Sequence, residues 1–430
     1  MMMAVALAIA GPRGPYLVVP IFAGLIVWST FALGRRIAGP TVALLAMLFV
    51  AASPVVVFQS LWPMTDVPIG ALWTAAAAVA LGGSRRHAVD AGVIAACAVL
   101  VRPNLPLVPA AFVIHFLLDG ASRREGLIRA ATFAACVAPA VVCVGYLNTR
   151  WYGGPFHSGY GTAATLYSIH SIWPNLQRYP VWLVQSHSIL SVLFLLPLVM
   201  WRRVEATSSG LRLAYLLIAA TWLSYLLYFA FEEWWYLRFL LPAIPAMMIL
   251  TAIATIALGR LAPVQWRGLV TVAVAAILLV GELRFTHDQR MFGLLYLTEQ
   301  RYVTIGLYLR RILPENGIVL AIQESGSARF YTGRPIVRLD LVEESWAPHA
   351  PSALIAAGYH PFAVFEDPEI PQLRAILGLD QNAPLPWRLI ARLNYPVGVT
   401  VYDLAPEGHP QPPVALSTGE GQRSVRGGAD

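Results

Sequence analysis

The stretch SLWPMTDVPIGAL occupies residues 60–72 and holds one carboxylate, that of Asp66, between two apolar runs. The flanking runs, 41–57 and 67–82, are long enough to cross or nearly cross a bilayer. An ionisable side chain at the edge of a membrane bundle is costly unless it faces water, a partner or a ligand. Asp66 is therefore a candidate functional residue.

The composition indicates a polytopic membrane protein. Of the 430 residues, 57% are hydrophobic and only 12% are charged, and the mean hydropathy is +0.62. A soluble domain of this size does not tolerate such values. The net charge of +7 comes from short arginine clusters between apolar runs rather than from one polar face, so we expect a lipid bilayer as partner and no nucleic acid.

Ten apolar runs predict about ten transmembrane segments, at residues 16–34, 41–57, 67–82, 88–101, 104–118, 127–148, 187–201, 211–231, 237–258 and 268–283. The pair around residues 102–104 could instead form a re-entrant hairpin. Short cytoplasmic loops hold the excess of positive charge. Arginines recur at every second loop, as Arg35–Arg36, Arg85–Arg86, Arg123–Arg124, Arg202–Arg203, and Arg260 with Arg267. Asp66 and the aromatic segment 151–185, predicted to be one long loop, are thereby assigned to the extracytoplasmic face.

Residues 284–405 are predicted to form a small extracytoplasmic α/β domain, because charges and turns return there and strand-like runs alternate with helix-like ones. The whole chain is therefore predicted to be an α-helical polytopic membrane protein (1–283) followed by this domain. The motifs at 325–327 and 331–333 match no phosphate loop or nucleophile elbow and are interpreted as turns. Residues 406–430 are rich in Pro, Gly, Ser and Arg and are predicted to be a disordered tail.

Four arginines, Arg102, Arg150, Arg178 and Arg238, fall in or beside the predicted outer loops, where the topology gives them no role. The planar guanidinium fork matches phosphate, so a phosphate-bearing ligand is one interpretation. The alternative is that each arginine reaches to the membrane interface or pairs with a carboxylate.

Asp66 has two interpretations. Its position before Val67 and Pro68 suits a helix cap whose carboxylate accepts free backbone N–H groups. It also suits a carboxylate that holds a divalent cation or positions an acceptor.

Two further groups accompany it on the predicted outer face. Glu232 and Glu233 lie a few residues before Arg238. They are candidates to bind a metal, to act together as general bases, or to form an ion pair with that arginine. The segment from residue 151 has a composition that suits stacking on sugar rings, through candidate substrate-contacting residues Trp151, Tyr152, His157 and Tyr160.

Four stretches resemble the bacterial GT-C superfamily of polytopic glycosyltransferases, which includes protein mannosyltransferases and aminoarabinose transferases. They are YLVVPIFAGLIVWSTFALGRRIAG at 16–39, SPVVVFQSLWPMTDVPIGALW at 53–73, AACAVLVRPNLPLVP at 95–109 and WWYLRFLLPAIPAMMIL at 234–250. The soluble region, with SGSARFYTGRPIVRLD at 325–340, resembles the periplasmic domain that follows the membrane part in many such proteins. Their order matches the predicted topology.

The resemblance implies an inverting transfer of a hexosyl or pentosyl group from a polyprenyl-phosphate donor to a lipid, glycan or protein acceptor, at the outer face of the bacterial inner (plasma) membrane. It implies that Asp66 positions a metal such as Mg or Mn, or the acceptor, and that Arg238, then Arg102, bind the donor phosphate. It also implies that the chain is truncated at its N-terminus. The family's first outer loop and its general base are then missing, which leaves two alternatives: a start assigned too late or an inactive protein.

Two other functions fit the same features. A transporter or flippase for a lipid-linked sugar would also need many helices and outer arginines, although such proteins place polar residues near the membrane midplane. A non-catalytic membrane protein that displays residues 284–405 would need no general base.

Overall fold

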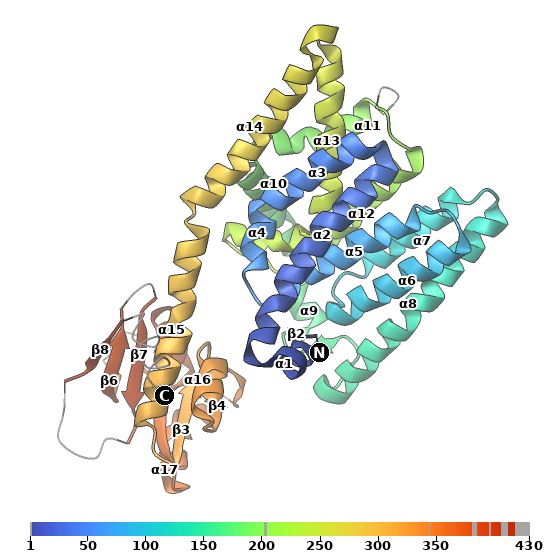
Figure 1. Ribbon diagram of the computed structural model, residues 1–430. Coiled ribbons are helices and arrows are strands. Elements are labelled where there is room, and N and C mark those ends of the chain that lie inside the picture. Colours follow the sequence, from blue (N-terminus) through green and yellow to red (C-terminus); the bar gives the residue numbers. More distant parts are fainter. Residues whose placement is uncertain are drawn as a thin grey trace. The chain divides into compact units, whose positions relative to one another are not determined.

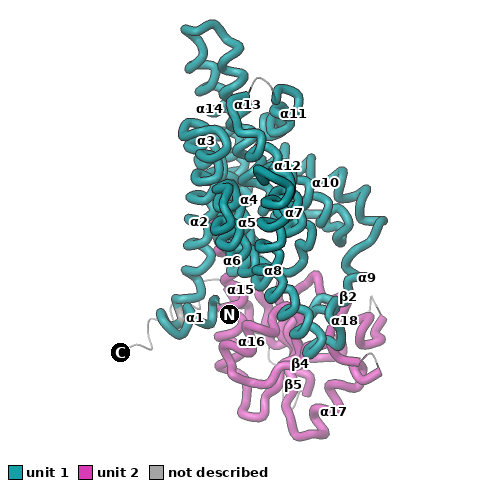
Figure 2. The backbone as a smooth tube through the Cα atoms, turned by 90° about the vertical axis from the view of Figure 1, so that its right-hand side faces the viewer, with its two compact units in different colours: residues 1–289 teal, residues 290–430 magenta. Residues whose placement is uncertain are grey.

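A computed structural model describes residues 2–201, 204–343, 345–380, 385–394, 397–405 and 412–417 (Figure 1). The chain divides into two compact units, residues 1–289 and 290–430 (Figure 2). The sequence places this boundary at 283/284, and the difference arises because helix α14 continues to Asp288.

The first unit is helical throughout, apart from one two-stranded hairpin. Five runs within the described residues are long and apolar enough to span a membrane: α2 (Gly14–Ala38), α8 (Arg123–Tyr152), α12 (Ser208–Leu226), α13 (Ile244–Leu261) and the run Val264–Ile312, which contains α14 (Arg267–Asp288). The remaining longer helices are α1 (Met2–Ala10), α3 (Pro40–Ala52), α4 (Pro54–Ser60), α5 (Asp66–Ala80), α6 (Arg85–Val101), α7 (Leu107–Asp119) and α10 (Ile172–His187).

Two pairs of helices are bent spans. α3 and α4 meet at 55°, because Pro54 ends the regular helix after Ala52. Ile169–His187 and Ile189–Val199 meet at 117°, where Ser188 adopts a φ of 64°. Counting each pair once gives up to seven candidate spans among the described residues, against the ten predicted. The other three predicted segments fall on α5, α6 and α7, whose 15, 17 and 13 residues are fewer than the ~20 that a straight span needs.

The prediction of one long loop over 151–185 was wrong. The segment contains the hairpin of β1 (His157–Ser158) and β2 (Gly161–Thr162), and then helix α10. α10 is amphipathic, with Asn175, Tyr179, Trp182, Leu183, Ser186 and His187 on its buried face. Its polar residues lowered the local hydropathy, which hid the helix from a search for apolar runs.

One end of the first unit is built from the predicted cytoplasmic loops. Arg36 Nη1 donates a hydrogen bond of 2.5 Å to the Ala78 carbonyl, so the end of α2 meets the end of α5. Arg260, at the end of α13, pairs with Glu205 at 2.6 Å. Arg202 and Arg203 lie outside the described residues.

The second unit contains a six-stranded sheet in the order β4-β3-β5-β7-β6-β8. β3 (Gly317–Ala321) is parallel to β4 (Ile336–Arg338) and β5 (His360–Glu366), and β7 (Val399–Asp403) is antiparallel to β5 and β6 (Arg388–Leu393). The helices are α15 (Met291–Ile312), α16 (Ser325–Thr332), α17 (Ala350–Ala356) and α18 (Ile370–Ile376).

Two predictions for this unit need correction. The motifs at 325–327 and 331–333, interpreted as turns, lie at the two ends of helix α16, which ends at Gly333 with a left-handed φ of 67°. The predicted tail contains β8 (Val414–Leu416), which pairs in parallel with β6 because that edge of the sheet was open to a further strand. Residues 406–411 and 418–430 lie outside the described residues.

An excess of carboxylates is buried in the second unit around one arginine. Arg301 of α15 lies 2.8 Å from Glu366, 3.9 Å from Glu324 and 3.8 Å from Glu299. Burial, strengthened by the charges of Glu366 and Glu369, raises the pKa of Glu324 to about 7, although Arg301 and a hydrogen bond from Ser327 oppose the shift. Glu324 is fully buried, and its Oε1 has no hydrogen-bond partner.

We expect Gly92→Ala to lower the unfolding temperature of the detergent-solubilised protein. A Cβ at Gly92 of α6 would lie 2.7 Å from Cys136 Cβ and 3.1 Å from the Phe133 carbonyl of α8, which is backbone that cannot yield. Overpacking of this kind costs about 1–3 kcal/mol. Gly24→Ala in α2 is the matched control, because nothing lies within 4 Å of that Cβ. Equal unfolding temperatures for the two variants would contradict close packing of α6 on α8.

The buried carboxylate predicts a pH dependence. Because the folded-state pKa of Glu324 is raised from 4.5 to about 7, the folded protein binds more protons than the unfolded chain between these values. The stability contribution is fully present below pH 4.5 and is lost as the pH rises to about 7, by about 3 kcal/mol.

Thermal unfolding of the full chain and of Glu324→Gln between pH 4.5 and 8 tests this dependence. The wild type should lose stability relative to the variant as the pH rises. A difference that stays constant with pH would show that Glu324 does not titrate in this range.

Candidate functional site

Asp66 and Arg102 form a buried ion pair. α5 begins at Asp66, and α6 ends at Val101, so that Arg102 follows in an extended conformation before Pro103. Arg102 Nη1 donates to Asp66 Oδ1, and the exposed fractions of the two side chains are 16% and 5%. Of the two interpretations of Asp66, the helix cap is not observed: Thr65 holds the cap position without a side-chain hydrogen bond, and the Asp66 carboxylate is bound to Arg102. The negative charge of Asp66 also lies at the positive, N-terminal end of the α5 helix dipole, which is favourable.

Arg102 and Arg238 face the same aromatic ring. The Arg102 Cζ atom lies 5.3 Å from the centroid of Phe239 and 5.8 Å from that of Tyr225. The Arg238 Cζ atom lies 5.4 Å from Phe239 and 4.9 Å from Tyr236. Both distances to Phe239 are in the range of cation–π attraction. We call Asp66, Arg102, Tyr225, Arg238 and Phe239 the arginine–aromatic cluster.

Arg238 has no carboxylate partner among the described residues. Its Nη1 contacts the Met64 sulfur at 3.0 Å, and its Nε is buried without a hydrogen-bond partner. Glu232 pairs with Arg178 instead, at 3.2 Å, and its side chain is 85% exposed. Glu233 is also exposed. The predicted pairing of these glutamates with Arg238 was therefore wrong, and the cluster has two guanidinium groups for one carboxylate.

Polar groups that the sequence reasoning missed frame the cluster. The hydroxyl of Tyr225 donates to Asn104 Oδ1 at 3.3 Å, and that of Tyr167 donates to the Asn104 carbonyl at 3.2 Å. Asn175 Nδ2 donates to the carbonyls of Tyr225 at 3.1 Å and Tyr228 at 2.7 Å. The sequence does hold one indication of the role of Asn175, which is an amide side chain within an amphipathic helix. A buried amide in a membrane bundle needs hydrogen-bond partners.

The predicted substrate segment has its aromatic side chains on the surface. Trp151 and Tyr152 end α8 and are exposed, and Tyr160, in the turn between β1 and β2, is 87% exposed. His157 Nδ1 lies 3.1 Å from the Tyr152 carbonyl, which fixes the hairpin on the end of α8. The segment joins the cluster through Tyr167, which forms a β-bridge with Tyr228.

The residues around Asp66 do not fit a metal site. The described residues contain no group of three or more His, Cys, Asp or Glu side chains that could hold a metal ion. Asp66 has Arg102 as its partner, and a guanidinium beside a lone carboxylate disfavours a second cation.

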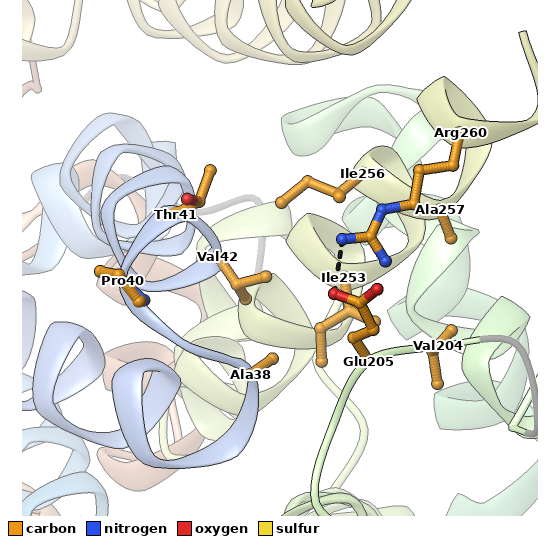
Figure 3. A pocket seen from close by; sticks show the side chains of 10 residues that line it. All are labelled: Ala38, Pro40, Thr41, Val42, Val204, Glu205, Ile253, Ile256, Ala257 and Arg260. Carbon is orange, nitrogen blue, oxygen red and sulfur yellow. Dashed lines mark hydrogen bonds and ion pairs between the residues drawn. The ribbon is translucent and has the colours of Figure 1, made fainter. Parts of the chain in front are cut away.

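A separate cavity of about 180 Å³ lies at the opposite end of the first unit (Figure 3). Apolar side chains and the Arg260–Glu205 ion pair both line it. Ala38, the last residue of α2, lines the cavity. Arg36 of the same helix donates a hydrogen bond to Ala78, so the cavity lies near the C-terminal end of α5. Since Asp66 begins α5, and its 15 residues are ~22 Å long, this cavity is remote from the arginine–aromatic cluster.

Solved structures share the fold of this chain, whereas no protein-family model and no curated protein matches it. ArnT from Cupriavidus metallidurans, bound to undecaprenyl phosphate, superposes with a TM-score of 0.58 and 14% identity over 95% of this chain and 88% of that chain. The Archaeoglobus fulgidus oligosaccharyltransferase in complex with Zn and sulfate gives a TM-score of 0.52 and 10% identity over 87% of this chain. The match covers 60% of the oligosaccharyltransferase. The chain thus has the fold of GT-C enzymes, as the sequence resemblance implied.

We expect Asp66→Asn to destabilise the protein by about 3 kcal/mol, because it leaves Arg102 buried without a counter-charge. Arg102→Gln alone should also destabilise, through the unpaired Asp66 carboxylate. The double variant should lose less than the sum, since neither member of the ion pair is then left without its counter-charge. Thermal unfolding of the three variants in detergent measures the interaction, and additive losses would show that the two side chains act independently.

Proposed function

We propose that this chain is a membrane glycosyltransferase. It takes a sugar from a polyprenyl-phosphate donor and transfers it to a lipid, glycan or protein acceptor at the extracytoplasmic face of the bacterial inner membrane. One observation carries the proposal: the Arg238 guanidinium has no carboxylate partner and shares the Phe239 ring with Arg102, whose own charge is already balanced by Asp66. The cluster therefore has one uncompensated positive charge at a site walled by aromatic rings.

A phosphate is the anion that best fits this arrangement. A guanidinium presents several N–H donors in one plane, which match the oxygens of a phosphate. The Nε of Arg238 is buried and unpartnered, so at least one donor is available without breaking an existing hydrogen bond. In a low-dielectric site this attraction is much stronger than in water.

The same charge supports the reaction. The acceptor forms a bond to the anomeric carbon of the sugar while the bond from that carbon to the phosphate oxygen breaks, and negative charge builds up on the departing polyprenyl phosphate. Cations fixed beforehand near that oxygen stabilise the transition state more than the ground state. We assign this role to Arg238 first and to Arg102 second. Asp66 is a positioning residue that holds the Arg102 guanidinium against the Tyr225 and Phe239 rings.

The shared fold supports the same ligand class. The ArnT structure contains undecaprenyl phosphate, and another structure of the oligosaccharyltransferase carries a tethered acceptor peptide. The exposed aromatic side chains of Trp151, Tyr152 and Tyr160 suit contact with a sugar ring or with lipid. The arginine pairs of the alternate loops support an orientation in which this end of the bundle faces outward.

We expect Arg238→Gln to weaken binding of undecaprenyl phosphate and to lower transfer of a sugar from the corresponding donor by about 100-fold, because a preorganised charge is lost. Arg150→Gln is the control, since Arg150 is exposed at the end of α8. Binding is measured by native mass spectrometry and transfer with radiolabelled donor in isolated membranes. Wild-type binding and turnover by Arg238→Gln would overturn the assignment.

A further inference from the structure

A second group of charged side chains is buried at the other end of the helix bundle. It consists of His115 and Asp119 near the end of α7, Arg129 near the start of α8, and Arg212 near the start of α12, and we call it the Arg129 cluster. α7 packs against both α8 and α12 (Figure 1). The turn between α7 and α8 is tight, since a Cβ at Gly120 would lie 2.4 Å from the backbone nitrogen of Gly126.

One carboxylate serves two guanidinium groups in this cluster. Asp119 Oδ1 lies 3.0 Å from Arg212 Nη2, and Asp119 Oδ2 lies 3.5 Å from Arg129 Nη2. Arg129 Nη1 donates to the Asp119 carbonyl at 3.3 Å, and its Cζ lies 5.1 Å from the Phe116 ring. With two arginines and one aspartate the formal charge is +1, and no further carboxylate among the described residues pairs with either arginine.

The polar groups that lack partners in the cluster are mainly donors. The Nε atoms of Arg129 and Arg212 are buried without hydrogen bonds. Both ring nitrogens of His115 are also unpartnered, and this side chain is completely buried. A neutral imidazole carries one N–H, so the cluster presents three unused N–H donors. A buried donor that remains unsatisfied destabilises the folded state.

The cluster is open on one side. His115 and Arg129 form its base, with exposed fractions of 0% and 1%, whereas the side chains of Arg212 and Asp119 are 31% and 18% exposed. The cluster is distinct from the arginine–aromatic cluster. Asn104 precedes α7 and Asp119 ends it, and the 13 residues of this helix separate them by ~20 Å.

We propose that the Arg129 cluster binds a phosphate group at the end of the bundle opposite Asp66. A phosphate supplies the negative charge and the several acceptor oxygens that the positive charge and the unused donors require. Two sources share this chemistry, the headgroup of an anionic phospholipid and free phosphate. The exposed apolar side chains of Leu117, Leu118 and Leu127 beside the cluster favour the lipid, because they leave the opening next to a surface suited to acyl chains.

The test uses the full chain in nanodiscs that contain phosphatidylglycerol and phosphatidylcholine. Retained phosphatidylglycerol is quantified after extraction into neutral detergent. Arg212→Gln should retain about tenfold less phosphatidylglycerol, because a charge-assisted hydrogen bond is lost. Asp119→Asn should retain more, because the carboxylate that competes with the phosphate is gone. Arg260→Gln is the control, since it removes the same charge from an exposed ion pair.

The opposite signs separate a binding site from a structural ion pair. If the cluster only holds the helices together, Arg212→Gln and Asp119→Asn both lower the unfolding temperature and neither changes the retained lipid, and the proposal is overturned. A parallel titration in detergent compares inorganic phosphate with chloride at matched ionic strength. Stabilisation by inorganic phosphate that Arg212→Gln abolishes, without selective lipid retention, identifies free phosphate as the ligand.

Discussion

The buried ion pair between Asp66 and Arg102 is the constraint on which the arrangement of the first unit depends. α5 and α6 are joined at one end by the short loop 81–84, and the ion pair joins their other ends. Neither charge can be buried alone in an apolar bundle, so the start of α5 and the end of α6 must stay at the same level. This contact also sets the position of the Arg102 guanidinium against Tyr225 and Phe239, and therefore the place where α12 and the segment before α13 approach it.

The charged members of the candidate site could be found from the sequence because charge is rare in this chain. Asp66, Arg102 and Arg238 stand out as ionisable residues beside apolar runs, and the structure brings all three together. Their pairing could not be found, because it depends on which helix ends meet. Asn104 and Tyr225 gave no signal, since their roles come from hydrogen bonds between segments far apart in the chain.

The helical class of the first unit could be predicted from the sequence, whereas the lengths of the individual helices could not. Hydropathy detects an apolar run but does not distinguish a span from a shorter helix buried among others, as with α5 and α7. It also misses α10, whose buried face carries the polar residues Asn175, Ser186 and His187. α16 was hidden by the glycines at its start and end, and β8 by a segment of low-complexity composition whose pairing with β6 is a tertiary contact.

The two units resolve an imbalance of buried charge in different ways. In the second unit Arg301 lies among three carboxylates, and the excess negative charge is relieved when Glu324, with a pKa of about 7, takes up a proton. In the first unit the excess is positive, in the arginine–aromatic cluster and again in the Arg129 cluster. Arginine does not release its proton in proteins, so a change of protonation offers no relief there. An anion is the remaining way to balance these charges, and a membrane offers anions mainly as phosphates attached to lipids.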